Sequence, residues 1–528
     1  MRKQLFAGLL AGAVALTAMP MATRADDRPE LVIAMAAMQR AHPAIAESNF
    51  DSRVIKSVMD GLLNRDWLNG PNGNDGTEIV AGLLTKWDRI SDTEWEFKVR
   101  QGVKFHNGRP MTAEDVAFTI SEERLWGEKA LEPHSLGSSI AGVEIVDPET
   151  IRVKTKYPDP VFLHRLAHVI GHVIPAKEYR ELGPEGFAAA PIGTGPYKWV
   201  RMAADEEIVL EAFDDYWGDK PPLKRITFKA VPETSARIAG LVTGEYDIIT
   251  SVPPDQAELI DREANYETRT IEVENMHHLT FMTGCGQENQ ACDRKSAVHD
   301  PRVRKAMILA VDRQKIADRL WNGMAKVPAG PNWEMYGKLF DAGRKPLPYD
   351  PEQAKALLKE AGYDGKEIVV AVTAGYYVNG DRAVQVMMQM WQQVGLNVRL
   401  QFVENWSQMR PYGWQDLWLN SSNIRIPDPL TPFWWRFGEP SATYASNKLV
   451  AVSDDYKRVG NTLEHTLDED TRIAAFKEGL DIWQRDNPAI IMYRPLEIYG
   501  VRKDIKWTPY SFYWMDFRAN NFSVKSGS

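Results

Sequence analysis

The chain has 528 residues, of which 44% are hydrophobic and 26% charged, and its formal net charge is −9. This length allows about three domains, and the composition is that of a folded protein rather than a disordered or fibrous one. The acidic balance excludes a general basic footprint for nucleic acid. Two cysteines are too few for a disulfide framework or a four-cysteine zinc site.

The first 25 residues have the pattern of a secretory signal peptide. Arg2 and Lys3 give a positive start, residues 5–18 form an apolar run, and Ala25 ends a small-x-small cleavage site. Pro20 interrupts the run before it reaches the roughly 20 residues that a membrane span needs. No cysteine stands at the cleavage point to accept a lipid. We therefore expect cleavage near Ala25 and a mature protein that is dissolved in the periplasm and not lipid-anchored.

Strand and helix patterns alternate along the rest of the chain, without a repeat of fixed period. The apolar run 31–35 predicts a buried strand, residues 54–63 have helical spacing, and residues 94–100 alternate as a half-exposed strand does. Thr112 is positioned to cap a helix that has two acids in its first turn. Further strands are predicted at 226–230, 247–250, 368–373 and 397–403, and further helices at 234–241, 301–321, 351–361 and 382–394. The order indicates an α/β fold with mixed sheets.

One long segment resembles a known family. Residues 95–120, WEFKVRQGVKFHNGRPMTAEDVAFTI, are similar to the best-known motif of the family 5 extracellular solute-binding proteins, which include dipeptide, oligopeptide and nickel binders of ABC importers. Further similar segments follow in the family's order, at 191–200, 213–233, 244–248, 300–316 and 349–363.

The resemblance implies a two-lobed periplasmic-binding-protein fold with hinge strands and an extra subdomain in the N-terminal lobe. Applied to this chain, residues 1–25 are the signal peptide, 26–272 form lobe I with the subdomain, 273–491 form lobe II, and 492–528 return to lobe I. The implied function is the capture of a small organic solute between the lobes and its delivery to an ABC transporter permease. We expect a monomer that is no enzyme, carries no cofactor and binds no nucleic acid.

Three alternatives stay open: an oligopeptide-binding protein, a metal-chelate binder and a secreted hydrolase. The hydrolase is the least supported, because HExxH, GxSxG, Walker and CxxC motifs are all absent from the sequence.

Arg425 predicts the character of the ligand. In peptide-binding relatives a stretch of lobe II reads approximately Gly-Trp-x-x-Asp-x-x-Asp-Pro, and its first acid pairs with the peptide's amino group. Aligned on Asp428 and Pro429, this chain has Arg425 in place of that acid and Ser422 in place of the Trp. A guanidinium repels an ammonium but binds a carboxylate, phosphate or sulfate through paired hydrogen bonds. We therefore expect an anionic or strongly hydrogen-accepting group on the ligand, unless Arg425 points outward or pairs with Asp428.

The other candidate ligand-binding residues are the segment after the first strand, several aromatic residues and the neighbours of Arg425. For each aromatic residue core packing is the alternative. His277 and His278 lie near the expected hinge, where alternation sends only one of them to a given face. The candidates are Met38, Gln39, Arg40, His42, Tyr377, Trp406, Trp418, Ser422 and Asn423.

Two further patterns concern metal binding and a disulfide. His164, His168 and His172 recur every four residues, as ligands on one helix face do, but no carboxylate completes the set and we expect no metal site. Cys285 and Cys292 are candidates for a small disulfide loop in an oxidising compartment.

Overall fold

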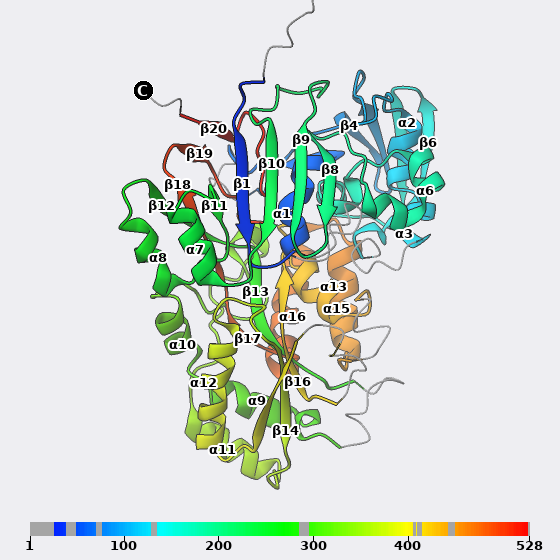
Figure 1. The fold of residues 1–528 in the computed structure, drawn as a ribbon. Coiled ribbons are helices and arrows are strands. Elements are labelled where there is room, and N and C mark those ends of the chain that lie inside the picture. Colours follow the sequence, from blue (N-terminus) through cyan, green and yellow to red (C-terminus); the bar gives the residue numbers. More distant parts are fainter. Residues whose placement is uncertain are drawn as a thin grey trace, which may run out of the picture.

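The chain forms two lobes, each built on a mixed sheet, and a smaller third sheet stands beside the first lobe (Figure 1). The computed structural model describes residues 26–38, 49–69, 76–127, 135–284, 295–404, 408, 414–441 and 449–525. Within these residues no helix is both long and apolar enough to cross a membrane.

The first lobe has a seven-stranded sheet of order β12-β18-β11-β1-β10-β9-β8. The central β1 (Glu30–Met35) runs parallel to β10 (Arg225–Ala230) and to β11 (Ile248–Ile249), and the remaining pairs are antiparallel. The other strands are β8 (Tyr197–Ala203), β9 (Glu207–Ala212), β12 (Tyr266–Glu272) and β18 (Leu496–Arg502). The helices of this lobe include α1 (Asn49–Val58), α7 (Thr234–Val242) and α8 (Pro254–Asp261).

The third sheet forms the extra subdomain that the resemblance implies, at the upper right of Figure 1. Its four antiparallel strands are β4 (Leu84–Ser91), β5 (Glu94–Val99), β7 (Thr150–Thr155) and β6 (Ile140–Asp147), in that order. They pack with α2 (Ala113–Thr119), α3 (Glu122–Gly127), α5 (Phe162–Leu166) and α6 (Ala176–Ala189). The predicted start of α2 is confirmed, since the Asp115 carboxylate accepts from the backbone N–H of Thr112 at 2.9 Å.

The second lobe has a five-stranded sheet of order β15-β14-β16-β13-β17. Its strands are β13 (Asn275–Phe281), β14 (Ile368–Thr373), β15 (Val398–Val403), β16 (Leu417–Asn423) and β17 (Ala489–Tyr493). One face of this sheet packs on α9 (Pro301–Leu309), α10 (Arg313–Leu320), α11 (Pro351–Glu360) and α12 (Gly380–Gln393) to form a separate apolar core.

Two predicted helices differ in extent from the structure. The pattern at 301–321 is divided into α9 and α10, because the Asp312 side chain accepts from the backbone N–H of Lys315 at 3.0 Å and starts a new helix. The helix predicted at 54–63 begins earlier and ends at Val58, and Leu63 already starts β2 (Leu63–Arg65), which pairs with β3 (Ile79–Ala81).

Four helical segments follow β16, and α13, α15 and α16 lie at middle height in Figure 1. They are the π-helical η5 (Leu430–Trp434), α13 (Trp435–Phe437), α15 (Asp454–His465) and α16 (Glu469–Asp486). Phe433, Trp434 and Trp483 belong to the same apolar core as Leu31 and Ile33 of β1. The core of the first lobe therefore continues into this part of the chain.

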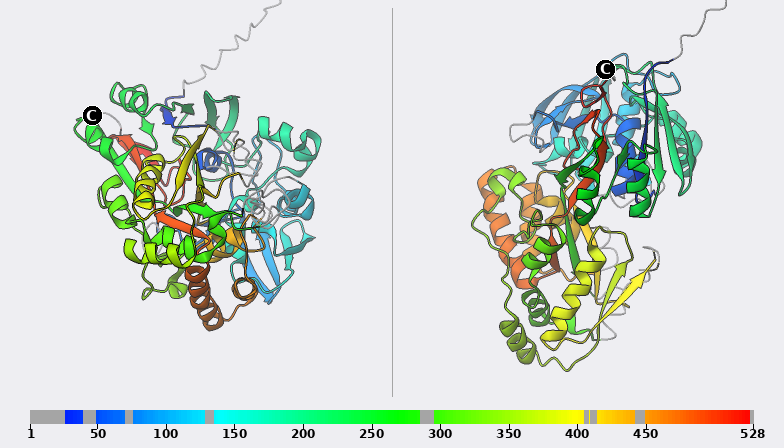
Figure 2. Two further views of the ribbon diagram at one scale, coloured as in Figure 1. Left: turned by 90° about the horizontal axis from the view of Figure 1, so that it is seen from below. Right: turned by 60° about the vertical axis from the view of Figure 1, so that its left-hand side comes forward.

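The chain passes between the two large sheets at two places. Val273 and Glu274 join β12 to β13, and Arg494 and Pro495 join β17 to β18. The crossings lie side by side, since the backbone N–H of Val273 donates to the carbonyl of Pro495 at 3.4 Å. Beyond β18 the chain stays with the first lobe and ends in the hairpin of β19 (Ile505–Trp507) and β20 (Phe522–Val524). The two crossings are the hinge strands, and the right-hand view of Figure 2 shows a lobe on either side of them.

Candidate functional site

The polar side chains at the end of β16 alternate between two faces. Ser421, Asn423 and Arg425 are half-buried, whereas Ser422 and Ile424 are buried. Successive side chains of an extended chain point in opposite directions. Ser421, Asn423 and Arg425 therefore share the more accessible face.

This face meets the first lobe at the start of α1. The Asn423 side-chain amide donates to Oδ1 of Asn49 at 2.9 Å. The rings of Phe50 and Tyr376 pack edge to face with centroids 5.7 Å apart. Asn49 and Phe50 belong to the first lobe, and Asn423 and Tyr376 belong to the second. The two contacts therefore mark a boundary along which the lobes face one another.

Arg425 lies at the same boundary, next to residues of the first lobe. Its backbone carbonyl accepts from Nη1 of Arg65 at 3.4 Å, and its positive charge contributes to lowering the pKa of His168. The carboxylate of Asp428, the alternative partner named from the sequence, is held by Nη2 of Arg472 at 2.8 and 2.9 Å. Asp428 is thereby bound to a residue of α16.

Positive charge gathers around His168. Burial holds the pKa of His168 well below its usual range, and Arg425, His172, Arg65 and Lys56 lower it further. His168 is therefore neutral at physiological pH. Burial also lowers the pKa of Lys56 to about 8.

Part of this charge is balanced within the protein. Arg65 forms a bidentate pair with Glu274, at 2.8 and 2.9 Å. The Lys56 ammonium donates to Oδ1 of Asn64 at 2.7 Å and lies 4.8 Å from the ring centre of Trp514. These contacts fix the two cations in place, and the positive charge of each contributes to lowering the pKa of His168.

Tyr377 and His277 form an aromatic wall beside Ser421. Their ring centroids are 4.6 Å apart, and the Tyr377 hydroxyl donates to Oγ of Ser421 at 3.2 Å. Burial raises the pKa of Tyr377 above its usual value and lowers that of His277 to about 3. Both side chains are therefore uncharged at neutral pH and act as hydrogen-bonding and stacking groups.

The candidate residues predicted from the sequence divide into some that lie in the core and some that lie at the lobe boundary. Met38 and Trp418 are packed in the large apolar core that also contains Leu31 and Ile33 of β1, with 5% and 4% of their surface exposed. Ser422 is equally buried, and its Oγ lies 2.9 Å from Nε2 of His278. Of the candidates, Arg425, Asn423 and Tyr377 come together at the boundary. Gln39, Arg40, His42, Trp406 and the cysteines Cys285 and Cys292 lie outside the described residues.

Sequence reasoning missed several residues of this region. Asn49, Phe50, Lys56 and His168 come from the first lobe and reach the boundary only through the fold. The alternation of polar and apolar residues from 423 to 426 was the available signal for the face that Asn423 and Arg425 share.

The three histidines that recur every four residues in the sequence do not share a helix face. His164 lies in α5, whereas His168 and His172 flank a separate 3-10 turn. Across the described residues, no group of three or more His, Cys, Asp and Glu side chains is arranged to hold a metal ion.

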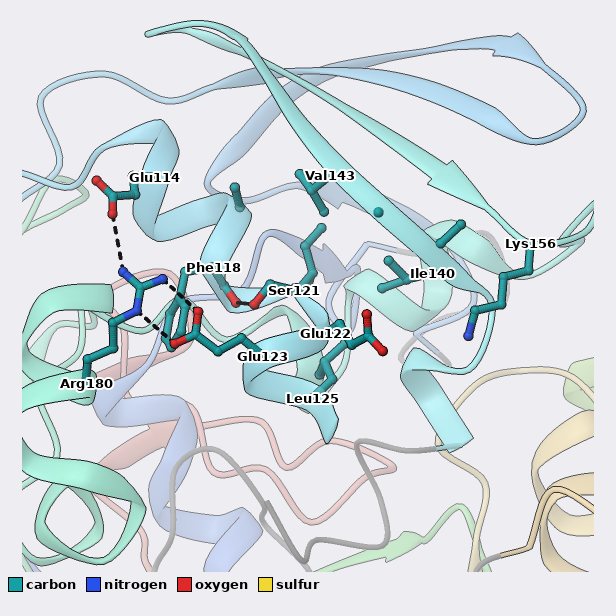
Figure 3. A pocket seen from close by; sticks show the side chains of 14 residues that line it. Glu114, Phe118, Ser121, Glu122, Glu123, Leu125, Ile140, Val143, Lys156 and Arg180 are labelled. Atoms are coloured by element: carbon teal, nitrogen blue, oxygen red, sulfur yellow. Dashed lines mark hydrogen bonds and ion pairs between the residues drawn. The ribbon is translucent and has the colours of Figure 1, made fainter. Parts of the chain in front are cut away.

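A hollow of about 320 Å³ lies elsewhere, in the subdomain between α2, α3 and β6 (Figure 3). The guanidinium of Arg180 pairs there with Glu123 at 2.8 Å and with Glu114 at 3.4 Å, and it lies over the ring of Phe118. The charged groups of this wall are thus largely satisfied by one another. The hollow contains none of the residues at the lobe boundary.

Solved structures share the whole architecture. A periplasmic binding protein of Helicobacter pylori associated with an ABC transporter, solved in complex with the peptide STSA, superposes with a TM-score of 0.81 at 21% identity over 94% of this chain and 99% of its own. The PBP AgaA of A. tumefaciens R10, in complex with agropinic acid, gives a TM-score of 0.79 at 22% identity over 94% and 99% of the two chains. The fold is therefore that of the two-lobed periplasmic binding proteins.

The family follows from sequence comparison. The model of "Bacterial extracellular solute-binding proteins, family 5 Middle" matches residues 78–444, well over half of the chain. The dipeptide-binding protein of Escherichia coli K12 is 25% identical over 470 residues, which span 81% of this chain and 83% of the relative. The chain belongs to the family 5 bacterial extracellular solute-binding proteins.

Proposed function

We propose that the protein captures a small anionic organic solute between its two lobes and delivers it to the membrane permease of an ABC importer, without chemical change. The carrying observation is Arg425 at the lobe boundary, in the positive field that surrounds the neutral His168. A carboxylate, phosphate or sulfate gains charge-assisted hydrogen bonds from such a site, whereas an ammonium is repelled.

The proposed capture relies on the two hinge strands. We take lobe I as residues 26–272 with the return 492–528, and lobe II as residues 273–491, limits that fall within three residues of the crossings Val273–Glu274 and Arg494–Pro495. A solute that binds both faces favours the closed arrangement in proportion to its differential affinity for that arrangement. The closed monomer is the form that the permease would recognise.

The peptide alternative draws its support from relatives. The E. coli relative is a dipeptide-binding protein, and the H. pylori structure contains a peptide. The AgaA structure contains agropinic acid, an acid rather than a peptide. Replacement of the amine-binding acid by Arg425 favours the acid over a ligand with a terminal ammonium.

The direct test is a thermal-shift screen of purified protein with sugar acids, opine-like conjugates, phosphorylated sugars and dipeptides, because a ligand raises stability by mass action. Hits are then titrated by calorimetry and recovered for mass spectrometry. We expect anionic hits that are recovered unchanged. A turned-over hit would establish the hydrolase alternative, and hits confined to dipeptides would establish the peptide alternative.

Substitution of Arg425 links the screen to the site. We expect Arg425→Ala to weaken binding of an anionic hit at least tenfold, about 1.4 kcal/mol, with little change in the unfolding temperature of the ligand-free protein. Arg262→Ala is the matched control, since Arg262 is an exposed arginine of the first lobe that pairs with Glu258 one helical turn away. Equal affinities for the two variants would remove Arg425 from the binding site.

Export is the remaining part of the proposal. We propose that residues 1–25 are removed and that the mature protein works in the periplasm. Intact-mass measurement of protein from a periplasmic extract is expected to give a chain that begins at Asp26.

A further inference from the structure

A second polar group faces the lobe boundary on the strands next to Arg425. Asn275 on β13 and Asn423 on β16 are directly opposite in the antiparallel register, as are His277 and Ser421 two residues along. Side chains at opposite positions lie on the same face, with Cβ atoms about 5 Å apart. Asn275, His277 and Asn423 therefore form one cluster, which we call the amide cluster.

Each member of the amide cluster has a polar atom without a protein partner among the described residues. These atoms are Oδ1 of Asn275, Oδ1 of Asn423 and Nδ1 of His277. Asn275 is completely buried and His277 is 3% exposed. Since buried polar atoms nearly always have hydrogen-bond partners, three unsatisfied ones on one face indicate a place for an additional partner.

The surroundings of the cluster hold it rigidly in place. The Asn275 amide nitrogen donates to the hydroxyl of Tyr513 at 3.2 Å, and that of Asn423 donates to Asn49 at 2.9 Å. Both amides are thereby oriented with their nitrogens engaged and their carbonyl oxygens available. The His277 ring is fixed between the rings of Tyr377 and Tyr493, at 4.6 and 5.5 Å.

The chemistry of these atoms selects the ligand group. Two carbonyl oxygens accept hydrogen bonds and carry no net charge, and His277 is neutral because burial lowers its pKa to about 3. Arg53, the nearby cation that stacks on Tyr513, is already paired with Glu497 at 3.1 Å. The cluster thus matches neutral donors such as hydroxyl or amide N–H groups. An apolar group placed there would leave the carbonyl oxygens unsatisfied.

The cluster is also correctly placed to serve one small molecule together with Arg425. Asn423 and Arg425 are two residues apart on the same face, which is about 7 Å in an extended chain. We infer that the amide cluster is a second subsite that selects anionic solutes with hydroxyl or amide N–H donors over equally sized anions without them. The inference rests on the anion site proposed above and names the other half of its ligand.

The test uses two pairs of acids, which are matched in carbon chain length in the first pair and in ring size in the second. D-gluconate is compared with hexanoate, and pyroglutamate with cyclopentanecarboxylate, by calorimetric titration of the unaltered protein. We expect the donor-bearing member of at least one pair to bind ten times or more tightly than its apolar partner. Equal binding within both pairs would overturn the inference while leaving the anion site intact. Failure of all four acids to bind would instead count against the anion site itself, and the inference would fall with it.

Two variants assign the preference to the cluster. Asn275→Leu and Asn423→Leu are expected to abolish the preference within a pair, whereas Arg425→Ala is expected to weaken both members of the pair equally. A preference that survives both Leu variants would overturn the assignment. The unfolding temperature of the ligand-free Asn275→Leu protein is the folding control, and we expect it to change little, because removal of an unsatisfied buried carbonyl offsets the lost hydrogen bond to Tyr513.

Discussion

Lys56 carries the titratable charge that reports most directly on the proposed anion site. Burial lowers its pKa to about 8, the positive charge of Arg518 lowers it, and the carboxylates of Asp516 and Asp60 act in the opposite direction. Lys56 therefore loses its proton within an accessible pH range.

We expect anion affinity to fall as the pH rises from 7 to 9. Protonated Lys56 contributes to the positive field at His168, and its deprotonation removes that contribution. Calorimetric titration of an anionic ligand at several pH values measures the effect. In Lys56→Met the affinity should be weaker and nearly constant between pH 7 and 9. A wild-type affinity that does not change across this range would separate Lys56 from the site.

The same group has the opposite effect on stability. The pKa of Lys56 is about 8 in the folded protein and near 10.5 in a solvated chain, so the unfolded state binds more protons between these values. The contribution of Lys56 to the free energy of unfolding therefore rises as the pH increases from 8 to 10.5. Urea unfolding of wild type and Lys56→Met at pH 7.5 and 9.5 measures this contribution. An equal pH dependence of the unfolding free energy in the two proteins would contradict the lowered pKa of Lys56.

At the scale of elements, α15 is joined to the subdomain by one buried carboxylate. Glu464 accepts from the Tyr157 hydroxyl at 2.9 Å and from Arg165 at 3.0 Å, both in the first lobe. It also accepts from the indole N–H groups of Trp434 and Trp435, at 2.8 and 3.0 Å. Burial opposes ionisation, but the charge of Arg165 and these donors together lower the pKa of Glu464.

We expect Glu464→Gln to lower the free energy of unfolding by about 2 kcal/mol, because Arg165, which keeps its pair with Asp159 at 2.7 Å, and the other donors lose charge-assisted hydrogen bonds. The contribution is present above pH 4.5 and disappears on acidification, since the carboxylate must remain ionised. Urea unfolding at pH 7 measures the loss. Glu478→Gln is the control on the neighbouring helix, because its pair with Arg458 is exposed. Equal losses in the two variants would show that the buried network contributes no more than a surface pair.

Much of the architecture could be predicted at this scale, because period and capping are local. Strands at 31–35, 94–100, 226–230 and 368–373 agree with β1, β5, β10 and β14 to within one residue. The division of 301–321 escaped prediction because both halves have helical spacing and only the Asp312 cap separates them. The subdomain and the two lobes were predicted from the resemblance to the family motif, because periodicity alone does not indicate how elements are grouped.

The candidate site was less predictable because it is assembled from distant segments. Arg425 stood out through its departure from the peptide-binding pattern, and Tyr377 and Asn423 were named with it. Trp418 and Met38 were predicted to bind ligand but are buried in the core. The sequence could not separate the two cases, because an apolar side chain beside a cleft and one in the core have the same local sequence signal. Asn275 could be recognised only from its register partner across the sheet.

At the scale of the molecule, the proposed function requires the lobes to move about two short crossings. We expect the radius of gyration, measured by small-angle X-ray scattering, to decrease when a saturating anionic ligand is added. In the Asn423→Ala protein, which lacks the contact to Asn49, the closed form should be less populated at the same ligand occupancy. A radius that stays constant at saturation would argue against closure as the capture mechanism.

The position of β18 has a consequence for biosynthesis. This strand is inserted between β12 and β11 in the sheet of the first lobe, yet it follows the entire second lobe in the sequence. As the chain emerges from its N-terminus into the compartment where it folds, β11 and β12 therefore have exposed edges until Leu496–Arg502 emerge as well, and open edges are templates for aggregation. The second lobe, whose strands are all complete at Tyr493, is able to fold first. Completion of the first lobe is thus the last step of assembly.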